Sequence, residues 1–261
     1  MTTSSLRVLD NPQTPSTEHI PSIDTAQREC TVTLQRFKGG TLSTLEDSIA
    51  VESELSVYIH DKPSVVLSRT PGDDLNLIIG HLFCNSMLKT PEEMTNINFS
   101  YQDATRVDVS LDANKSLRRI FPKRPNVRLA PNQLLELKET FEYRQNLFKN
   151  TGSTHAAALF SLGGRLLAFG EDVGRHNAFD KAIGRALLEG TLAQTAIAML
   201  SSRIAVELTA KATTANIPVL CGFSAATSSG VSYAEKHDIT LIGRLKTSSF
   251  EVYTNAWRIR D

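Results

Sequence analysis

Residues 195–243 alternate short apolar stretches with amphipathic ones, and this alternation constrains the fold more than any other feature of the chain. Short links between each strand and the helix after it give right-handed crossovers, which place consecutive strands parallel in one sheet. The sequence therefore predicts an α/β fold built on a parallel sheet. The predicted elements are the strands Thr195–Leu200, Pro218–Cys221 and Ile239–Gly243 and the helices Arg203–Thr214 and Thr227–Lys236.

The segments on either side extend this predicted domain. Gly163 and Gly164 separate two apolar stretches, Ala157–Leu162 and Arg165–Phe169, in the manner of a β-hairpin. The other predicted elements are a helix over 179–187, a last strand over 250–254, and a helix of about 17 residues over 134–148 that bridges the two halves of the chain.

The first half of the chain has a different pattern of apolar and polar residues. Ser, Thr and Pro fill 12 of the first 29 positions, so we expect residues 1–29 to form a disordered tail. Strands are predicted over 31–37, 54–59, 64–68, 96–100 and 106–111, with a helix that is capped by the turn at 70–73 and runs to about residue 88. We therefore expect a smaller, strand-rich α+β domain over 30–130 and the α/β domain over 131–261.

Composition excludes several classes of protein. The 28 basic residues balance 28 acidic ones, whereas a general nucleic-acid binder carries a basic excess. No apolar run exceeds five residues and the N-terminus does not resemble a signal peptide, so we expect no membrane segment and a cytoplasmic location. The three cysteines, Cys30, Cys84 and Cys221, lie far apart in the sequence, which argues against a disulfide framework or a cysteine-based zinc site.

One segment departs from this balance. Six basic residues and no acidic residue fall between Lys115 and Arg128, and Pro122 and Pro125 prevent a continuous helix or central strand there. The segment is therefore predicted to be a basic loop.

Three links of the α/β half carry polar side chains where strands lead into helices: Glu171–Asn177, Ser201–Arg203 and Ser224–Ser229. Ligands of open α/β sheets collect at this edge, and hydroxyls, free N–H groups and guanidinium groups there hold phosphate or another anion. Helix capping alone is the simpler explanation for any single Ser or Thr.

Two histidines are candidates for ligand binding or proton transfer. His155 follows a Gly-containing turn, and His176 lies between Arg175 and Asn177 at a predicted helix N-terminus. Asp180 and Lys181 can line the same helix face as Asn177 or be ordinary solvated charges. The motifs of serine hydrolases, phosphate-binding loops and zinc deaminases are all missing from the sequence.

Taken in order, these segments resemble the formate dehydrogenase accessory proteins, the FdhD/NarQ sulfurtransferase family. The resemblance covers about residues 54–254. The matching stretches are Thr70–Asp73, Thr151–Ala157, Glu171–Lys181, Ser201–Arg203, Ile217–Val219, Ser224–Ser228 and Val252–Thr254.

The resemblance implies a C-terminal three-layer α/β/α domain of the cytidine-deaminase-like type, without its zinc and with no other metal site. It also implies a role in carrying sulfur from a cysteine desulfurase to the molybdenum bis(molybdopterin guanine dinucleotide) cofactor of formate dehydrogenase. GDP or GTP would mimic that cofactor, and a homodimer is the default assembly.

The resemblance further implies a set of cofactor-binding residues. A loop just before Val252 is the family's cofactor loop, and here one of its positive charges has moved to Arg244. The implied residues are His155, Asp172, Gly174, Arg175, His176, Asn177, Asp180, Ser201, Ser202, Arg203, Ser224, Thr227, Ser228, Arg244, Leu245, Lys246, Thr247, Ser248 and Ser249.

The family's persulfide loop, Cys-Gly-x-Cys, has no counterpart in this chain. Phe121, Pro122, Lys123 and Arg124 occupy the corresponding region, and neither Lys nor Arg replaces a thiolate as a sulfur carrier. One possibility is a sulfur carrier that uses Cys30 or Cys84 instead of the missing cysteines. Two alternatives remain beside it. One is a paralogue that binds the cofactor or a guanine nucleotide without transferring sulfur, and the other is an unrelated nucleotide-handling enzyme on a similar sheet.

Overall fold

The computed structural model describes residues 27–100, 105–112 and 127–260. Most of the predicted tail and of the basic loop, including Phe121, Pro122, Lys123 and Arg124, lies outside the described residues. No described helix is long and apolar enough to cross a membrane.

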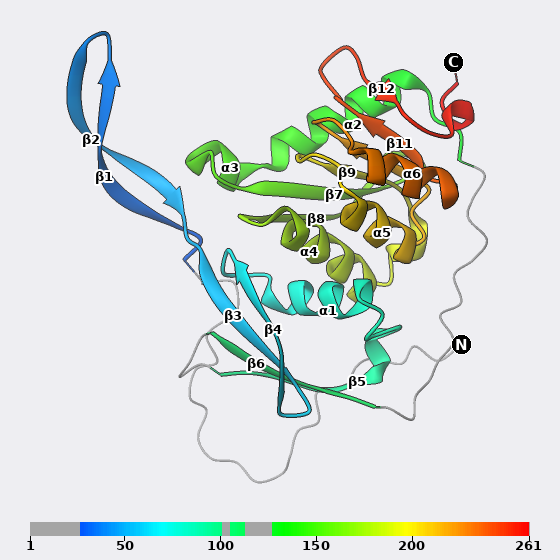
Figure 1. Cartoon of the computed structure of the whole chain (residues 1–261), viewed down its shortest axis with the longest axis horizontal. Coiled ribbons are helices and arrows are strands. Elements are labelled where there is room, and N and C mark those ends of the chain that lie inside the picture. The colour runs from blue at the N-terminus through cyan, green and yellow to red at the C-terminus, as the bar shows by residue number, and fades with distance from the viewer. Residues whose placement is uncertain (1–26, 101–104, 113–126, 261) are drawn as a thin grey trace.

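A six-stranded sheet forms the centre of the C-terminal half, with the strand order β12-β11-β10-β9-β7-β8 (Figure 1). The three strands predicted to be parallel are parallel, and β7, β8 and β12 join them as antiparallel neighbours. The strands are β7 (His155–Ser161), β8 (Leu166–Asp172), β9 (Thr195–Leu200), β10 (Val219–Gly222), β11 (Thr240–Gly243) and β12 (Glu251–Val252).

The register brings the ends of these strands to one edge. Ala157 of β7 pairs with Leu200 of β9, and His155 pairs with Asp172 of β8. Because β7 runs against its neighbour β9, it starts where the parallel strands end, and β8 ends there too. The first residue of β7 therefore lies beside the loops that follow the other strands.

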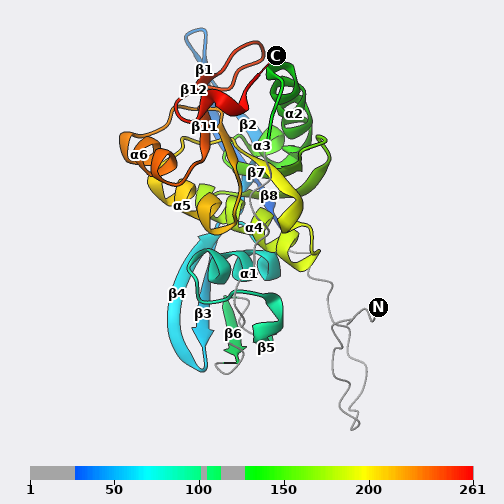
Figure 2. The same ribbon diagram turned by 90° about the vertical axis from the view of Figure 1, so that its right-hand side faces the viewer.

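Helices cover both faces of this sheet, as the α/β prediction requires. Figure 2 shows α2 on one side and α5 and α6 on the other. The alternation of side chains explains this arrangement, because Ala158 and Phe160 pack with the α2 layer while Ala157 and Leu159 pack with the opposite layer. The helices are α2 (Pro131–Arg144), α4 (Arg175–Leu188), α5 (Val206–Thr214) and α6 (Ser228–Lys236), with short 3₁₀ turns η3 (Leu192–Gln194) and η4 (Ala256–Arg258).

A four-stranded sheet, in the order β4-β3-β6-β5, and one helix form the N-terminal half. Leu55, Val57, Val107 and Val109 of the sheet pack against the buried face of α1, which confirms the α+β prediction. The elements are β3 (Ser53–Ile59), β4 (Lys62–Arg69), α1 (Asp74–Cys84), η2 (Pro91–Glu93), β5 (Met94–Phe99) and β6 (Arg106–Leu111).

The ends of α1 differ from the prediction. The helix ends at Cys84 rather than near Leu88, because Ser86 has a left-handed backbone (φ 60°) that a helix cannot continue. Asp73 precedes the first turn but does not cap it with its side chain. Its carboxylate instead pairs with Arg185 of α4 at 2.7 Å.

The two halves meet where α1 crosses α4. A Cβ atom at Gly80 would lie 1.9 Å from the carbonyl oxygen of Asp180, and one at Gly184 would lie 1.9 Å from that of Asn76. Only glycine permits this approach. The predicted helix over 134–148 breaks at Gln145, after which α3 (Asn146–Thr151) begins. The first part, α2, packs on the sheet, whereas α3 reaches the N-terminal part of the chain, where Asn150 donates to the Glu29 carboxylate at 3.2 Å.

A long hairpin of β1 (Glu29–Lys38) and β2 (Thr41–Ala50) extends away from both halves (Figure 1). Its second strand was not predicted, because a polar, largely exposed strand carries little alternation of apolar and polar residues. Phe37 and Leu42 pair near its tip and are both exposed.

Candidate functional site

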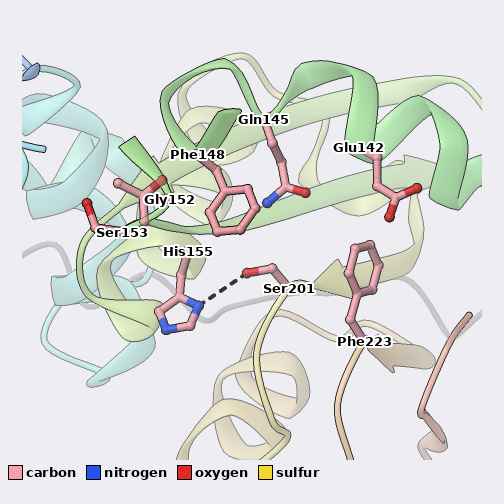
Figure 3. Close-up of a pocket in the computed structure, with 9 residues that line it drawn as sticks. Glu142, Gln145, Phe148, Gly152, Ser153, His155, Ser201 and Phe223 are labelled. Carbon is pink, nitrogen blue, oxygen red and sulfur yellow. Dashed lines mark hydrogen bonds between the residues drawn. The ribbon is translucent and has the colours of Figure 1, made fainter. Parts of the chain in front are cut away.

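A pocket of about 380 Å³ opens at the sheet edge where the parallel strands end. Figure 3 shows α2 and α3 on one side of it and the ends of β7, β9 and β10 on the other. The lining residues are Glu142, Gln145, Phe148, Gly152, Ser153, Thr154, His155, Ser201 and Phe223.

His155 and Ser201, both predicted from the sequence, lie side by side in this pocket. His155 Nδ1 is 3.3 Å from Ser201 Oγ, which also accepts a hydrogen bond from the backbone N–H of Ala156 at 3.0 Å. Burial, together with the positive charge of Arg175, lowers the pKa of His155 below its usual value. The imidazole is therefore neutral near pH 7 and offers one donor and one acceptor.

Two polar groups in the pocket lack partners. The hydroxyl of Thr154 is buried and makes no hydrogen bond. Gln145 is only 6% exposed overall, and its side-chain amide bonds to no described residue but stays accessible from the pocket. Buried polar groups nearly always have partners, and leaving one unpaired costs about 1–3 kcal/mol. The buried Thr154 hydroxyl therefore indicates a place where a ligand or ordered water binds, and the Gln145 amide is free to contact it.

Lys138 of α2 is a buried lysine that contacts two residues of the pocket lining. Lys138 Nζ lies 2.5 Å from Glu142 Oε1 and 5.1 Å from the centre of the Phe223 ring. The lysine thus connects a carboxylate on one side of the pocket with an aromatic ring on the other.

Glu171 fixes the start of α3. Its carboxylate accepts hydrogen bonds from the backbone N–H groups of Leu147 at 3.2 Å and Phe148 at 3.0 Å. These are N–H groups of the first helical turn, which have no partners within the helix. Because Phe148 lines the pocket, Glu171 sets the position of one pocket wall without facing the pocket.

Asp172 is a buried structural carboxylate. It pairs with Lys181 Nζ at 2.7 Å and accepts hydrogen bonds from the N–H of Gly174, the amide of Asn177 and the N–H of Thr70. Asn177 also donates to the carbonyl of Ser68 at 2.6 Å. This cluster ties the N-terminal half to the loop before α4. The predicted cofactor contacts of Asp172 and Asn177 stay predictions, because these groups are already paired within the protein.

Asp180 also faces inward. Lys211 Nζ of α5 donates to both carboxylate oxygens at 2.5 Å, and His81 Nδ1 of α1 lies 3.7 Å away. The carboxylate thus joins α1, α4 and α5. None of these contacts within the described part of the chain involves a residue that lines the pocket.

Arg175 and His176 open α4 after Gly174, and both are half-buried. No acidic residue lies in the first turn, so the positive end of the helix dipole is not offset there. Burial, with the charges of Arg175 and Lys211, lowers the pKa of His176. The arrangement suits an anion.

The loops after β9 and β10 are joined to each other. Ile204 pairs with Ala226 as an isolated bridge, and the N–H of Thr227 donates to the carbonyl of Ile204 at 3.0 Å.

The predicted site residues of these loops differ in their roles. The Thr227 side chain accepts a hydrogen bond from the N–H of Gly230 at 3.2 Å, so Thr227 caps α6, as the simpler explanation predicted. Ser228 and Arg203 are exposed, Ser224 is half-buried, and buried Ser202 donates to the carbonyl of Arg203. Helix α5 starts at Val206, so Arg203 lies in a loop rather than in the predicted helix.

The loop 244–249 lies next to these segments. Arg244 and Leu245 donate backbone hydrogen bonds to Ser224 and Gly222, and the Arg244 guanidinium binds Glu251 at 2.9 and 3.2 Å. Leu245 is buried in the core, which leaves its side chain no part in an exposed site. The exposed residues of the loop are Arg244, Lys246, Thr247, Ser248 and Ser249.

A model of the FdhD/NarQ family matches residues 105–260 of this chain. The chain belongs to the FdhD/NarQ family. This confirms the resemblance read from the motifs.

Two curated members of the family show how far the similarity extends. The sulfur carrier protein FdhD of Sulfolobus acidocaldarius is 33% identical over 246 residues, which cover 87% of this chain and 97% of that protein. The sulfur carrier protein FdhD of Streptomyces avermitilis is 35% identical over 262 residues, covering 86% of this chain and 93% of that protein.

A solved structure supports the fold. A crystal structure assigned as a formate dehydrogenase accessory protein from Desulfotalea psychrophila superposes with a TM-score of 0.78 at 22% identity. The match covers 90% of this chain and all of that one.

The three cysteines of this family member differ in access. Cys221 is fully buried, and burial raises the pKa of its thiol far above the usual value. Cys30 at the base of the β1–β2 hairpin and Cys84 at the end of α1 are half-buried. The described residues contain no group of three or more His, Cys, Asp or Glu side chains placed to hold a metal ion.

Several pocket residues were missed by the sequence reading. Phe223 directly follows β10 at the predicted edge, so the rule that located Ser201 applies to it as well. Glu142, Gln145 and Phe148 come from the helix pair that covers the sheet. No local pattern distinguishes them from solvent-facing helix residues.

Proposed function

We propose that this FdhD/NarQ protein is an accessory factor of formate dehydrogenase that takes part in sulfur transfer to the enzyme's molybdenum cofactor. Its curated relatives carry the name sulfur carrier protein FdhD. The cargo would be molybdenum bis(molybdopterin guanine dinucleotide), bound at the edge where β9, β10 and β11 end. The observation that carries the proposal is the pocket at this edge, with the unpaired Thr154 hydroxyl and Gln145 amide in its wall.

Charged and polar groups at the same edge of the sheet, outside the pocket lining, fit a phosphate-rich cargo. Arg175 and His176 at the start of α4, Arg203 after β9 and Lys246 after β11 supply positive charge or N–H donors. Ser248 and Ser249 supply exposed hydroxyls. Charge-assisted hydrogen bonds from such groups hold phosphate oxygens, and the proposal involves no zinc.

Binding of guanine nucleotide tests this half of the proposal. Calorimetry with GDP and GTP should detect binding, and Arg203→Ala and His176→Ala should each weaken it by about tenfold. Arg165→Ala is the control, because Arg165 lies in the β7–β8 turn and bonds to Gln194. Unchanged affinity in both site variants would refute the proposed site.

The sulfur itself would come from a cysteine desulfurase as a persulfide. A carrier thiol must reach the donor, which excludes buried Cys221 and leaves Cys30 and Cys84. The absence of cysteine between residues 85 and 220 favours a second candidate function, a paralogue that binds the cofactor or a guanine nucleotide without transferring sulfur.

Mass spectrometry after incubation with a cysteine desulfurase and cysteine decides between the two. Sulfur transfer predicts a mass increase of one sulfur atom that disappears in Cys30→Ser or in Cys84→Ser. A persulfide on neither cysteine would refute sulfur transfer and support the paralogue.

The proposal has two further parts: formate dehydrogenase is the second partner, and the protein assembles as a homodimer. Pull-down with the enzyme and light scattering test them.

A further inference from the structure

We propose that the pocket binds a 2-amino-4-oxopyrimidine ring, the ring portion that guanine and pterin share, and that Glu142 and Gln145 read its edge. This inference rests on the proposed function, since the proposed cargo contains both ring systems. It adds the orientation of the ring and the residues that select it.

The hydrogen-bonding edge of this ring has three groups in a row. A carbonyl oxygen accepts, while the neighbouring ring N–H and the exocyclic amino group donate. A protein that recognises the edge needs one donor beside two adjacent acceptor positions. A carboxylate next to an amide provides this set, because the amide NH₂ donates and the two carboxylate oxygens accept.

Glu142 and Gln145 provide that set in this protein. They are three residues apart at the end of α2, so they lie on the same face of the helix. Figure 3 shows both side chains directed toward the pocket, on the side opposite Ser201. The Gln145 amide lines the pocket and makes no hydrogen bond to a described residue, so its donors and its acceptor are available to a ligand.

Lys138 holds the Glu142 carboxylate in place. Its ammonium group contacts Oε1 at 2.5 Å and is itself buried. An ionised carboxylate has about four acceptor positions, so the contact with Lys138 leaves others for the ring N–H and amino group. Lys138 is therefore a positioning residue for the recognition of the ring.

Phe148 and Phe223 supply flat apolar surface on two sides of the pocket (Figure 3). Phe148 is 44% exposed in the free protein, an unfavourable position for a large apolar side chain. A planar heterocycle would cover it and make stacked or edge contacts with the phenyl rings.

The same set of groups rejects adenine. Adenine presents a ring nitrogen lone pair where guanine has an N–H, and that lone pair would face the Glu142 carboxylate. Opposed acceptors cannot share a hydrogen bond, and the lone pair is repelled by the negative charge of the carboxylate.

Calorimetry with three nucleotides tests the inference. GDP should bind at least about tenfold more tightly than IDP, which lacks the amino group, because a hydrogen bond to a charged group is worth about 1.5–3 kcal/mol. ADP should bind more weakly than either. Pterin and lumazine form the matching pair for the pterin source, since lumazine has oxygen in place of the amino group.

Two variants separate the roles of the two side chains. Glu142→Gln should bring the GDP and IDP affinities together. Gln145→Leu should weaken GDP and IDP by a similar factor, about tenfold, because both keep the carbonyl that the amide would contact. Glu139→Gln is the control, an exposed glutamate of the same helix outside the pocket. Thermal unfolding checks that each variant is folded.

The outcomes distinguish this inference from the proposed function. Discrimination of GDP from IDP that is lost in Glu142→Gln supports guanine as the bound ring. The same dependence with pterin and lumazine alone supports pterin as the bound ring. Equal affinities within both pairs would overturn the inference. Binding of GDP that still depends on Arg203 would in that case leave the proposed function intact, and no binding of any probe would refute both.

Discussion

The ammonium group of Lys181 lies 2.7 Å from the carboxylate of Asp172, and both side chains are buried. Lys181 also donates to the carbonyl of Thr70 at 2.8 Å. The pair therefore joins the segment before α1 to the strand that ends at the pocket edge. Its integrity affects both the stability of the fold and the position of the site.

Removing one member of this pair should be strongly destabilising. Lys181→Met leaves the Asp172 carboxylate buried without its counter-charge, which typically costs about 3–5 kcal/mol. Urea denaturation measures the change in the free energy of unfolding. Arg36→Ala is the control, because the Arg36–Asp47 pair on the hairpin is exposed and its loss should cost no more than about 1 kcal/mol. Equal losses in the two variants would contradict this assignment.

The crossing of α1 and α4 predicts a second stability effect. Gly80→Ala or Gly184→Ala would place a methyl group against backbone carbonyl oxygen, which cannot move aside as a side chain can. We expect a loss of about 3 kcal/mol, the upper end of the cost of overpacking a core. Gly163→Ala in the β7–β8 turn has open space and should leave the melting temperature nearly unchanged. A small effect at both helical glycines would mean that the helices are further apart.

The acid sensitivity of the fold should depend on Asp180. Burial acts to raise its pKa, but the charge and hydrogen bonds of Lys211, together with nearby His81, outweigh burial, so the pKa lies below its usual value. The unfolded chain then takes up the proton first, and the free energy of unfolding falls as the pH drops through about 4.

Denaturation midpoints measured between about pH 6 and pH 3 test this effect. Asp180→Asn should be less stable than the wild type at neutral pH, because Lys211 loses its partner. The variant should also lose stability less steeply as the pH falls. Parallel curves for the two proteins would assign the acid sensitivity to other groups.

Much of the fold could be predicted because the strands of the C-terminal sheet are buried on both faces. Thr195–Leu200 and its parallel neighbours appear as short apolar runs, and the helices between them bury one face each. The hairpin strand Thr41–Ala50 has no such pattern, since it packs against little of the protein. Its hydrogen bonds to β1 fix it, and such bonds depend on the backbone rather than on side-chain type.

The candidate site could be predicted only in part, for a similar reason. The rule that ligands collect where parallel strands end located Ser201, and the Gly-containing turn before His155 singled that residue out. The rule cannot tell a carboxylate that faces a ligand from one that is paired inside the protein. Asp172 ends strand β8 and Asp180 lies in the following helix α4, and only the positions of Lys181 and Lys211 in three dimensions show that both carboxylates are paired. Glu142 and Gln145 reach the pocket because the helix breaks there, without a proline or glycine to signal the break.

Glu171 offers a test of how the pocket wall is held. Glu171→Leu removes the acceptor for the N–H groups of Leu147 and Phe148, so the first turn of α3 loses its anchor. Hydrogen exchange of the amides in Asn146–Thr151 should accelerate by about tenfold or more. Affinity for GDP should fall with it, although Glu171 itself does not line the pocket. Glu189→Leu at the exposed end of α4 is the matched control. Unchanged exchange in α3 together with weaker GDP binding would mean that Glu171 contacts the ligand directly.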